Sequence, residues 1–101
     1  MYDLVFHKEV AGDISDAITY YANISPGLTS RFEKELFAKF RQIQHYPLHY
    51  GFLDIKRKNY FRRVMLRTFP YKIVYAFEEN VIVVYGVIHG KRSPRHILKR
   101  F

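Results

Sequence analysis

The feature that most constrains this chain is a change in the spacing of its apolar residues near residue 60. Between residues 8 and 45 the apolar side chains recur every three or four positions, which is the period of an amphipathic α-helix. From Tyr60 to His89 they alternate with a period of two, which is typical of β-strands. The chain therefore predicts a helical half followed by a strand half, which is the order of an α+β domain.

The helical half divides at the sequence Ser-Pro-Gly-Leu, residues 25–28. Ser25 is suited to cap a helix and Pro26 to occupy its first position, so one helix is expected over 8–23 and a second from Pro26 to about His45. The second helix should end there because the residue before Pro47 avoids helical geometry. Two helices joined this closely predict an antiparallel helical hairpin.

The strand half contains a short hairpin turn at Glu79-Asn80, where Asn tolerates the left-handed backbone that such turns need. A helical hairpin packed on one face of a small antiparallel sheet is the predicted architecture, with the element order β-α-α-β-β-β-(α). The expected strands are 4–6, 61–68, 71–78 and 81–89, and a last short helix capped by Ser93 is expected over 93–100.

The whole chain, residues 1–101, is expected to form a single domain. It contains no cysteine, which excludes disulfides and thiolate metal sites and is consistent with a reducing compartment. No segment approaches the roughly 18 apolar residues of a membrane span, and the start lacks the pattern of a signal peptide. We therefore expect a cytoplasmic protein without a membrane contact, and no cofactor or metal site. His45 and His49 lack the spacing of zinc ligands.

The positive charge of the chain is segregated. The net charge is +8, yet residues 1–55 carry five Lys or Arg against seven Asp or Glu, whereas residues 56–101 carry twelve against two. Such asymmetry suggests a face that meets a polyanion or an acidic protein. Charge that serves only solubility would explain the excess but not its segregation. Asp13, Asp16 and Glu33 are expected to be solvated helix positions.

The turn positions predict which residues share a face of the sheet. The turn at Glu79-Asn80 places Tyr71 opposite Ile88, and a turn centred on Phe69-Pro70 places Arg67 opposite Lys72. The face predicted to lie against the helices carries Val64, Leu66, Tyr71, Ile73, Tyr75, Phe77, Ile82, Val84, Gly86 and Ile88. The other face is predicted to carry Arg63, Arg67, Lys72, Tyr85 and His89 over Met65, Val74, Ala76, Val83 and Val87.

This second face is expected to stay free of helices and to bind a negatively charged partner, because large exposed apolar patches mark binding sites. Two like charges directly opposite each other, such as Arg67 and Lys72, also repel unless an anion lies between them. The alternative is that the charges reach the rim and the apolar residues are ordinary sheet packing.

Three segments carry a family resemblance: SPGLTSRFEKEL (25–36), RRVMLRTFPYKIVY (62–75) and VIVVYGVIHGKRSP (81–94). In this order, over nearly the whole chain, they resemble the RelE/ParE superfamily of small bacterial toxins, and specifically its ParE, or plasmid-stabilisation, branch. The resemblance implies a β-α-α-β-β-β fold and the toxin half of a type II toxin–antitoxin pair. It also implies a hetero-oligomer with a cognate antitoxin, which neutralises the toxin by laying an extended, often helix-containing segment over it.

Two targets follow from the resemblance. ParE-like toxins poison DNA gyrase, and RelE-like toxins enter the ribosomal A site and cut mRNA. Against the RelE pattern, Arg63, Lys72 and Arg92 match basic positions, but Met65 replaces a second basic residue. The C-terminal tyrosine of RelE-like enzymes also has no counterpart, so the groups that would move protons are incomplete.

The preferred hypothesis is therefore a non-catalytic toxin that binds gyrase. Its predicted partner-binding residues are Arg63, Arg67, Lys72, Tyr85, His89, Lys91 and Arg92. One alternative is a ribosome-dependent, metal-independent mRNA endoribonuclease, in which His89 moves protons; its catalytic residues would be Arg63, Lys72, His89 and Arg92. A second alternative is an inactive relic that only binds its antitoxin.

Overall fold

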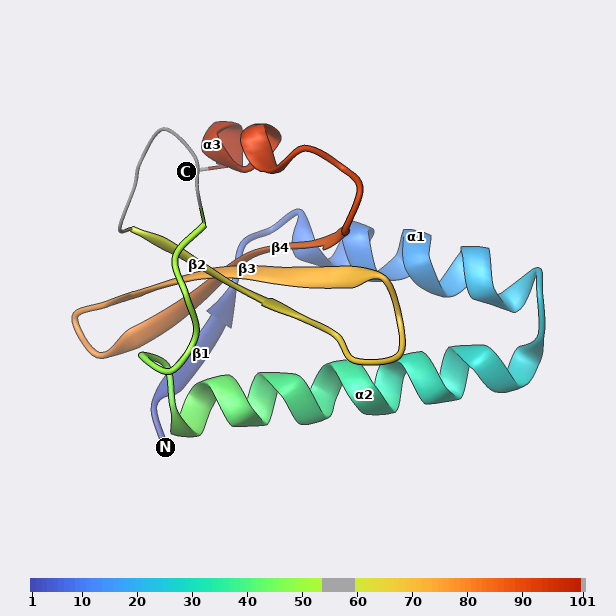
Figure 1. Ribbon diagram of the computed structural model, residues 1–101, viewed down its shortest axis with the longest axis horizontal. Coiled ribbons are helices and arrows are strands. Elements are labelled where there is room, and N and C mark those ends of the chain that lie inside the picture. The colour runs from blue at the N-terminus through green and yellow to red at the C-terminus, as the bar shows by residue number, and fades with distance from the viewer. Residues whose placement is uncertain (54–59, 101) are drawn as a thin grey trace.

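The computed structural model describes residues 1–53 and 60–100 of the chain, which form a four-stranded sheet with a helical hairpin on one face (Figure 1). This confirms the predicted α+β class and element order. The elements are β1 (Asp3–Phe6), α1 (Val10–Ala22), α2 (Pro26–His45), β2 (Phe61–Met65), β3 (Tyr71–Glu78), β4 (Val81–His89), a 3-10 turn (Pro94–His96) and α3 (Ile97–Arg100). The charged residues Lys56, Arg57 and Lys58 and the terminal Phe101 lie outside the described residues.

The strands lie in the order β1-β4-β3-β2. The hairpins β2–β3 and β3–β4 are antiparallel, as predicted, whereas β1 joins the sheet parallel to β4. In Figure 1 the strands lie between α2, below them, and α3, above them. One face of the sheet is therefore covered by the helical hairpin, and the other is covered in part by α3.

The core between the hairpin and the sheet contains aromatic rings in edge-to-face contact. Phe32 of α2 is fully buried. Its ring meets that of Phe69 edge-to-face with 5.3 Å between the centroids, and the ring of Tyr21 on α1 lies beside it in a tilted contact at 5.5 Å. Such rings bury large apolar areas and favour edge-to-face geometry. The apolar positions whose spacing predicted the hairpin are thus the ones that form this core. Ser25 and Pro26 occupy the predicted N-cap and first helical positions of α2.

The register of β3 and β4 agrees with the prediction only near the turn. Glu79 and Asn80 have φ angles of 52° and 65°, and Tyr75 lies opposite Val84 as expected. Between Val74 and Tyr75 the pairing shifts by one residue, so that Val74 lies opposite Gly86. This is a β-bulge, which places one extra residue on β4 and reverses the alternation of side chains beyond it.

The bulge makes the predicted faces wrong for the last part of β4. Val87 packs in the core beneath the helices, and His89 lies beside Tyr71 and α1, although both were assigned to the opposite face. Gly86 and Ile88, which were assigned to the helices, face α3. A glycine inside a strand is a known mark of a bulge, so Gly86 was the signal in the sequence.

The register of β2 and β3 differs from the prediction by two residues. Met65, not Arg67, lies opposite Lys72, because the loop of residues 67–70 closes at a hydrogen bond from the Leu66 N–H to the Tyr71 carbonyl (2.8 Å). A shift of two keeps every side chain of β2 on its predicted face. The predicted repulsion between Arg67 and Lys72 therefore does not occur, and Arg67 lies beyond the end of the strand.

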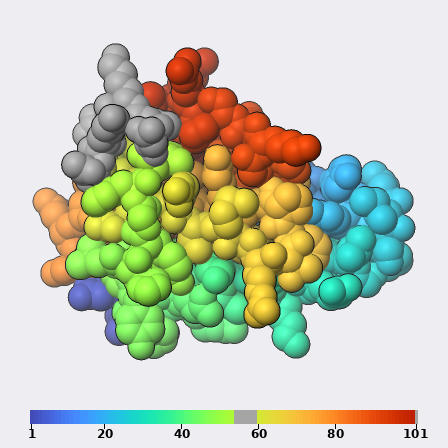
Figure 2. Space-filling view, viewed as in Figure 1, coloured from blue at the N-terminus to red at the C-terminus, as the bar shows by residue number. Residues whose placement is uncertain are grey.

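The second face of the sheet was expected to stay free of helices. It instead carries a core of its own. Its buried residues are Leu53, Phe61, Val74, Ala76, Tyr85, Ile88 and Ile97. Ile97 of α3 is fully buried, and a Cβ atom placed on Gly86 would lie only 2.6 Å from its Cδ1 atom. Figure 2 shows the C-terminal segment, in red, lying against the strand residues. The chain thus covers part of this apolar surface itself.

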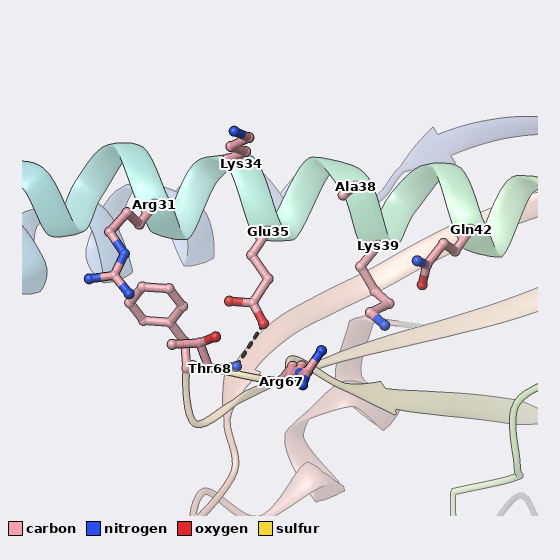
Figure 3. Close-up of a pocket in the computed structure, with 9 residues that line it drawn as sticks. Arg31, Lys34, Glu35, Ala38, Lys39, Gln42, Arg67 and Thr68 are labelled. Carbon is pink, nitrogen blue, oxygen red and sulfur yellow. Dashed lines mark hydrogen bonds between the residues drawn. The ribbon is translucent and has the colours of Figure 1, made fainter.

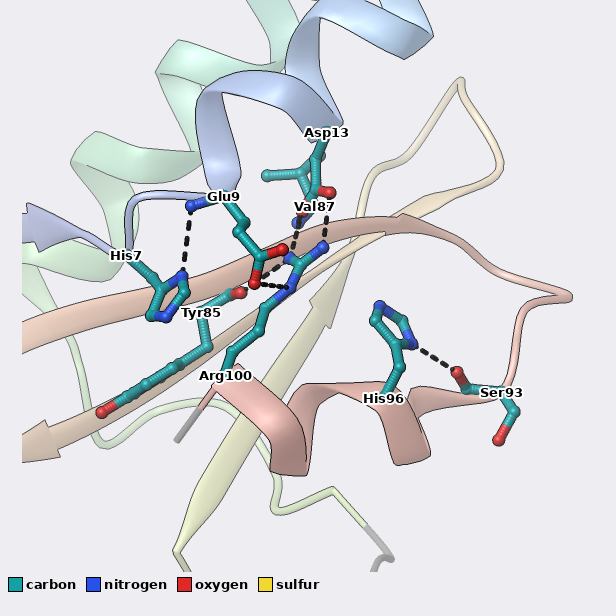
Figure 4. Close-up of polar contacts among 8 residues, drawn as sticks. All are labelled: His7, Glu9, Asp13, Tyr85, Val87, Ser93, His96 and Arg100. Atoms are coloured by element: carbon teal, nitrogen blue, oxygen red, sulfur yellow. Dashed lines mark hydrogen bonds and ion pairs between the residues drawn. The ribbon is translucent and has the colours of Figure 1, made fainter.

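An ion pair between Asp13 of α1 and Arg100 of α3 joins the two layers at the edge of β4 (Figure 4). The guanidinium Nη1 and Nη2 atoms donate to the two carboxylate oxygens at 2.6 and 2.8 Å, and both side chains are more than nine-tenths buried. The same groups bind the backbone at the bulge, because the Val87 N–H donates to Asp13 (3.0 Å) and Arg100 donates to the Tyr85 carbonyl (3.0 Å). Asp13 is therefore not the solvated position that was expected.

No helix in the described part of the chain is both long and apolar enough to cross a bilayer. Likewise, among the residues that the structure describes, no group of three or more His, Asp or Glu side chains could hold a metal ion.

We predict that Asp13→Ala lowers the free energy of unfolding by about 3–5 kcal/mol, because it removes the bidentate partner of a buried guanidinium, to which Glu9 remains as a longer contact (3.4 Å), and the acceptor of the Val87 N–H. Asp16→Ala, an exposed change on the same helix, should alter stability by less than about 0.5 kcal/mol. Chemical denaturation of both variants measures the difference. Equal stability of the two variants would show that the ion pair does not hold α3 in place.

Candidate functional site

The structure divides the predicted partner-binding residues among separate surfaces. Arg63 and Lys72 lie on the face that was predicted to be free of helices, where Tyr85 is buried in the second core. Arg67 lines a groove beside α2, His89 and Arg92 line a pocket beside α1, and Lys91 is exposed after β4. The single converging patch that the sequence suggested does not form, because the bulge and the longer β2–β3 loop redirect its members.

Lys72 is the most unusual of these side chains because it is a lysine with only 8% of its surface exposed. It lies between Met65 of β2 and Ile88 of β4, and its ammonium has no hydrogen-bond or ion-pair partner within residues 1–53 and 60–100. Burial, and secondarily the positive charge of Arg63, lowers the pKa of Lys72 below its ordinary value of 10.5. A carboxylate or phosphate oxygen of a partner would supply the missing contact.

Two tyrosines lie in the second core on this face. Tyr85 is only 9% exposed and packs edge-to-face on Phe61, with 5.3 Å between the ring centroids. Tyr60 donates its hydroxyl hydrogen to Glu78 (2.7 Å), and burial together with this bond raises its pKa above 10. Tyr60 therefore stays a neutral phenol at physiological pH, and Tyr85 supports the surface from below.

A groove of about 580 Å³ separates α2 from the β2–β3 turn (Figure 3). Its lining residues are Arg31, Lys34, Glu35, Ala38, Lys39, Gln42, Arg67, Thr68 and Phe69. Glu35 accepts a hydrogen bond from the Thr68 N–H at 2.7 Å, which fastens the turn to the helix. The groove residues on α2 escaped the sequence analysis, although they recur every three or four positions along the helix, and most of them point towards the β2–β3 turn.

A smaller pocket of about 290 Å³ lies between α1 and the end of β4. His89 is held there by two contacts: its Nδ1 atom accepts from the Lys91 N–H (3.1 Å), and its ring centroid lies 5.4 Å from that of Tyr71. Asp16 and Arg92 also line this pocket. His89 and Arg92 are therefore on the helix side of the sheet, whereas Arg63 and Lys72 are on the other side.

His96 ends the 3-10 turn before α3 and was not among the predicted site residues. Its Nδ1 atom lies 3.0 Å from the Ser93 carbonyl oxygen, and its buried Nε2 atom has no hydrogen-bond partner among the residues that the structure describes. Because a carbonyl only accepts, the Nδ1 atom carries the hydrogen. Burial lowers the pKa of His96 below 6.5, which keeps the ring neutral. His96 thus helps to position the turn before α3.

Comparisons with known proteins agree with this fold. The family model of the ParE toxin of the type II toxin–antitoxin system parDE matches residues 4–94. A search among curated proteins found none that matches.

Two solved structures share the fold. A chain of the chromosomal ParDE TA system from P. aeruginosa has a TM-score of 0.75 and 13% sequence identity, covering 88% of this chain and 96% of that one. The isolated E. coli RelE toxin has a TM-score of 0.58 and 17% identity, covering 99% of this chain and 98% of that one. These likenesses support the architecture, and the family match over residues 4–94 carries the assignment. The chain belongs to the ParE toxin family of type II toxin–antitoxin systems.

Proposed function

We propose that this toxin inhibits DNA gyrase by binding it, without cutting RNA, and that a cognate antitoxin neutralises it. The observation that carries the proposal is the separation of the residues that RNA cleavage would need. Arg63 and Lys72 lie on one face of the sheet, and His89 and Arg92 line a pocket on the other.

Cleavage of RNA without a metal needs three things at one phosphodiester: a base for the 2′-hydroxyl, positive charge for the phosphorane, and an acid for the leaving oxygen. Arg63 and Lys72 can supply the charge. A group that moves a proton must come within hydrogen-bond reach of its substrate atom. His89 is turned towards Tyr71 and the Lys91 N–H, on the far side of the sheet from Lys72. The arrangement therefore suits binding better than catalysis.

The Arg63–Lys72 surface suits an acidic partner for a simple electrostatic reason. Lys72 is largely buried, this burial lowers its pKa, and no ion pair within the described residues compensates for the desolvation. A carboxylate that docks on it therefore gains a strong contact in a poorly solvated place. The additional cost of desolvating Lys72 is smaller than it would be for an exposed lysine. Met65, which lies opposite Lys72 and is 45% exposed, would contribute apolar contact beside the charge.

One observation favours the ribonuclease alternative. A lysine whose pKa is lowered gives up its proton more readily, so Lys72 has the direction of shift that a general base requires. Gyrase binding remains our preferred function, because the lowered pKa of one residue does not provide a complete set of proton donors and acceptors.

We predict that the purified protein inhibits supercoiling by gyrase and leaves mRNA intact in a ribosomal translation assay. Arg63→Ala and Lys72→Ala should each weaken the inhibition of gyrase by about tenfold or more, because each removes a contact charge. Lys8→Ala, an exposed lysine outside this surface, should leave the inhibition unchanged. Codon-dependent cuts in mRNA that disappear in Arg63→Ala or Lys72→Ala would establish the ribonuclease instead. A protein that binds its antitoxin but affects neither assay nor growth would be the inactive relic.

We predict that Lys72→Met raises the free energy of unfolding at pH 7 by about 1–3 kcal/mol, since it removes a largely buried, partly desolvated charge that no ion pair within the described residues compensates. The folded-state pKa of Lys72 lies below the unfolded value, so the charged lysine costs stability at neutral pH. That cost fades as the pH rises through the lowered pKa towards 10.5, and the advantage of methionine should shrink over the same range. Denaturant titrations at pH 7 and pH 10 test this, with Lys8→Met as the exposed control. A gain that does not change with pH would mean that burial of the charge is not its cause.

A further inference from the structure

We infer that a second copy of this chain pairs with the outer edge of β1, so that the two sheets join across a two-fold axis. The inference goes beyond the proposed function and does not depend on it. Arg63 lies on β2 and Lys72 on β3, whereas the pairing uses β1 at the other end of the sheet.

The two outer strands of the sheet differ in how their edges are covered. Residues 51–53 run along the edge of β2: the Arg63 N–H donates to the Gly51 carbonyl (3.0 Å), and the Leu53 N–H donates to the Phe61 carbonyl (2.7 Å). Among residues 1–53 and 60–100, no such segment runs along β1. An uncovered edge is a template for pairing with another chain.

The backbone of β1 turns two residues towards this uncovered edge. The His7 N–H donates to the Val84 carbonyl of β4 at 2.9 Å. Because successive residues of a strand turn their backbone groups to opposite sides, the N–H and C=O groups of Leu4 and Phe6 point away from β4. The outer edge of β1 thus offers two donors and two acceptors.

The helix α2 limits this edge at one end. The Tyr2 N–H donates to the Gln44 carbonyl at 3.1 Å, and the Gln44 side chain donates to the Tyr2 carbonyl at 3.1 Å. Figure 1 shows this start of the chain beside the end of α2. Tyr2 is therefore already paired, and Leu4 and Phe6 are the residues of β1 that remain for a partner strand.

One antiparallel register uses all four outward groups of β1. It places Leu4 opposite Phe6 of the second copy and, by symmetry, Phe6 opposite Leu4 of the second copy, with Val5 on the two-fold axis. A shift of two residues in one direction would set Phe6 against Tyr2 of the second copy, which α2 already holds. A shift in the other direction would set Leu4 against Lys8 of the second copy, beyond the end of the strand.

This register also brings opposite polar groups together. Asp3 comes to lie opposite His7 of the second copy, on the same face as Val5. The His7 Nδ1 atom accepts the Glu9 N–H at 3.2 Å (Figure 4), so its Nε2 atom carries hydrogen and can donate to the Asp3 carboxylate. The contact occurs twice across the axis. Such self-complementarity is what a two-fold interface between identical chains requires, and it favours a second copy over an unrelated strand.

Exposed apolar side chains flank the same edge. β1 has only four residues, so its hydrogen bonds need support from apolar contact. Val5 is 47% exposed and Phe6 49%, and Phe37 of α2 is 46% exposed. The rings of Phe6 and Phe37 both contact that of Phe40, at 5.2 and 6.0 Å between centroids, and so form one patch. β1 carries neither the Lys nor the Pro that commonly protects such an edge.

The first test is a cross-link, and the absence of cysteine from the chain makes it specific. Two Val5 residues on the axis form a non-hydrogen-bonded pair with their Cα atoms about 4.5 Å apart, which a disulfide can span. Val5→Cys should therefore become a covalent dimer on mild oxidation. Ile24→Cys is the matched control, since Ile24 is 58% exposed and lies outside β1. It should stay monomeric under the same conditions.

The second test measures association by sedimentation velocity. The wild-type chain should form dimers with a dissociation constant in the micromolar range, about 1–100 µM, because the interface is small. Asp3→Arg and His7→Asp each place like charges opposite each other twice, and each should raise the dissociation constant about tenfold. The double variant Asp3→Arg/His7→Asp restores opposite charges and should return within about threefold of the wild type. Thermal melts check that each variant is folded.

Three results would overturn the inference. One is a wild-type chain that stays monomeric across this concentration range. Another is a Val5→Cys variant that cross-links no faster than Ile24→Cys, and a third is a double variant no better than either single change. If the chain alone is monomeric and Val5→Lys abolishes its binding to the product of the adjoining gene, the edge belongs to that protein and not to a second copy. Gyrase and mRNA assays do not enter these tests, so failure of the proposed function is detected separately.

Discussion

The buried contact between Asp13 and Arg100 is the interaction on which the two-layered arrangement of this toxin depends. Burying two charges is costly, and such a pair persists only where geometry is good and further hydrogen bonds satisfy both partners. Here the guanidinium meets the carboxylate in a bidentate contact, and each partner also binds a backbone group of β4. β1 pairs with β4 only as far as Val84. Just beyond that point, the Asp13–Arg100 ion pair binds the Tyr85 carbonyl and the Val87 N–H of β4. It thereby ties α1 on one face to α3 on the other.

The bulge in β4 explains both this contact and the distribution of charge. One extra residue turns Val87 towards the hairpin and leaves Gly86 facing α3, where only a hydrogen fits beside Ile97. The same shift carries His89 away from Lys72. A strand of regular alternation would have kept Lys72 and His89 on one face. The folded protein instead distributes its basic residues over separate surfaces.

The burial of the charged Lys72 side chain lowers the stability of the folded protein. Its neighbours in the sheet are apolar, and the described part of the chain offers its ammonium no counter-charge. A methionine would fit the strand pattern equally well and would not need hydration. Natural proteins commonly keep such unfavourable groups where binding requires them. This cost supports the proposal that the Arg63–Lys72 surface, rather than the more exposed basic residues, meets the target.

The local structure of this protein is determined by its sequence. Apolar spacing defines the hairpin and the strands, Ser25 and Pro26 start α2, and Glu79-Asn80 adopts the backbone of a tight turn, because these effects act between residues close in the chain. The inner face of β3 was predicted correctly for the same reason. Tertiary structure alone decided the position of the bulge, the parallel pairing of β1 with β4, and the neighbours of Asp13 and Lys72. Those features depend on contacts such as Asp13 with Arg100, 87 positions apart, whose effect on burial and hydrogen bonding no local pattern encodes.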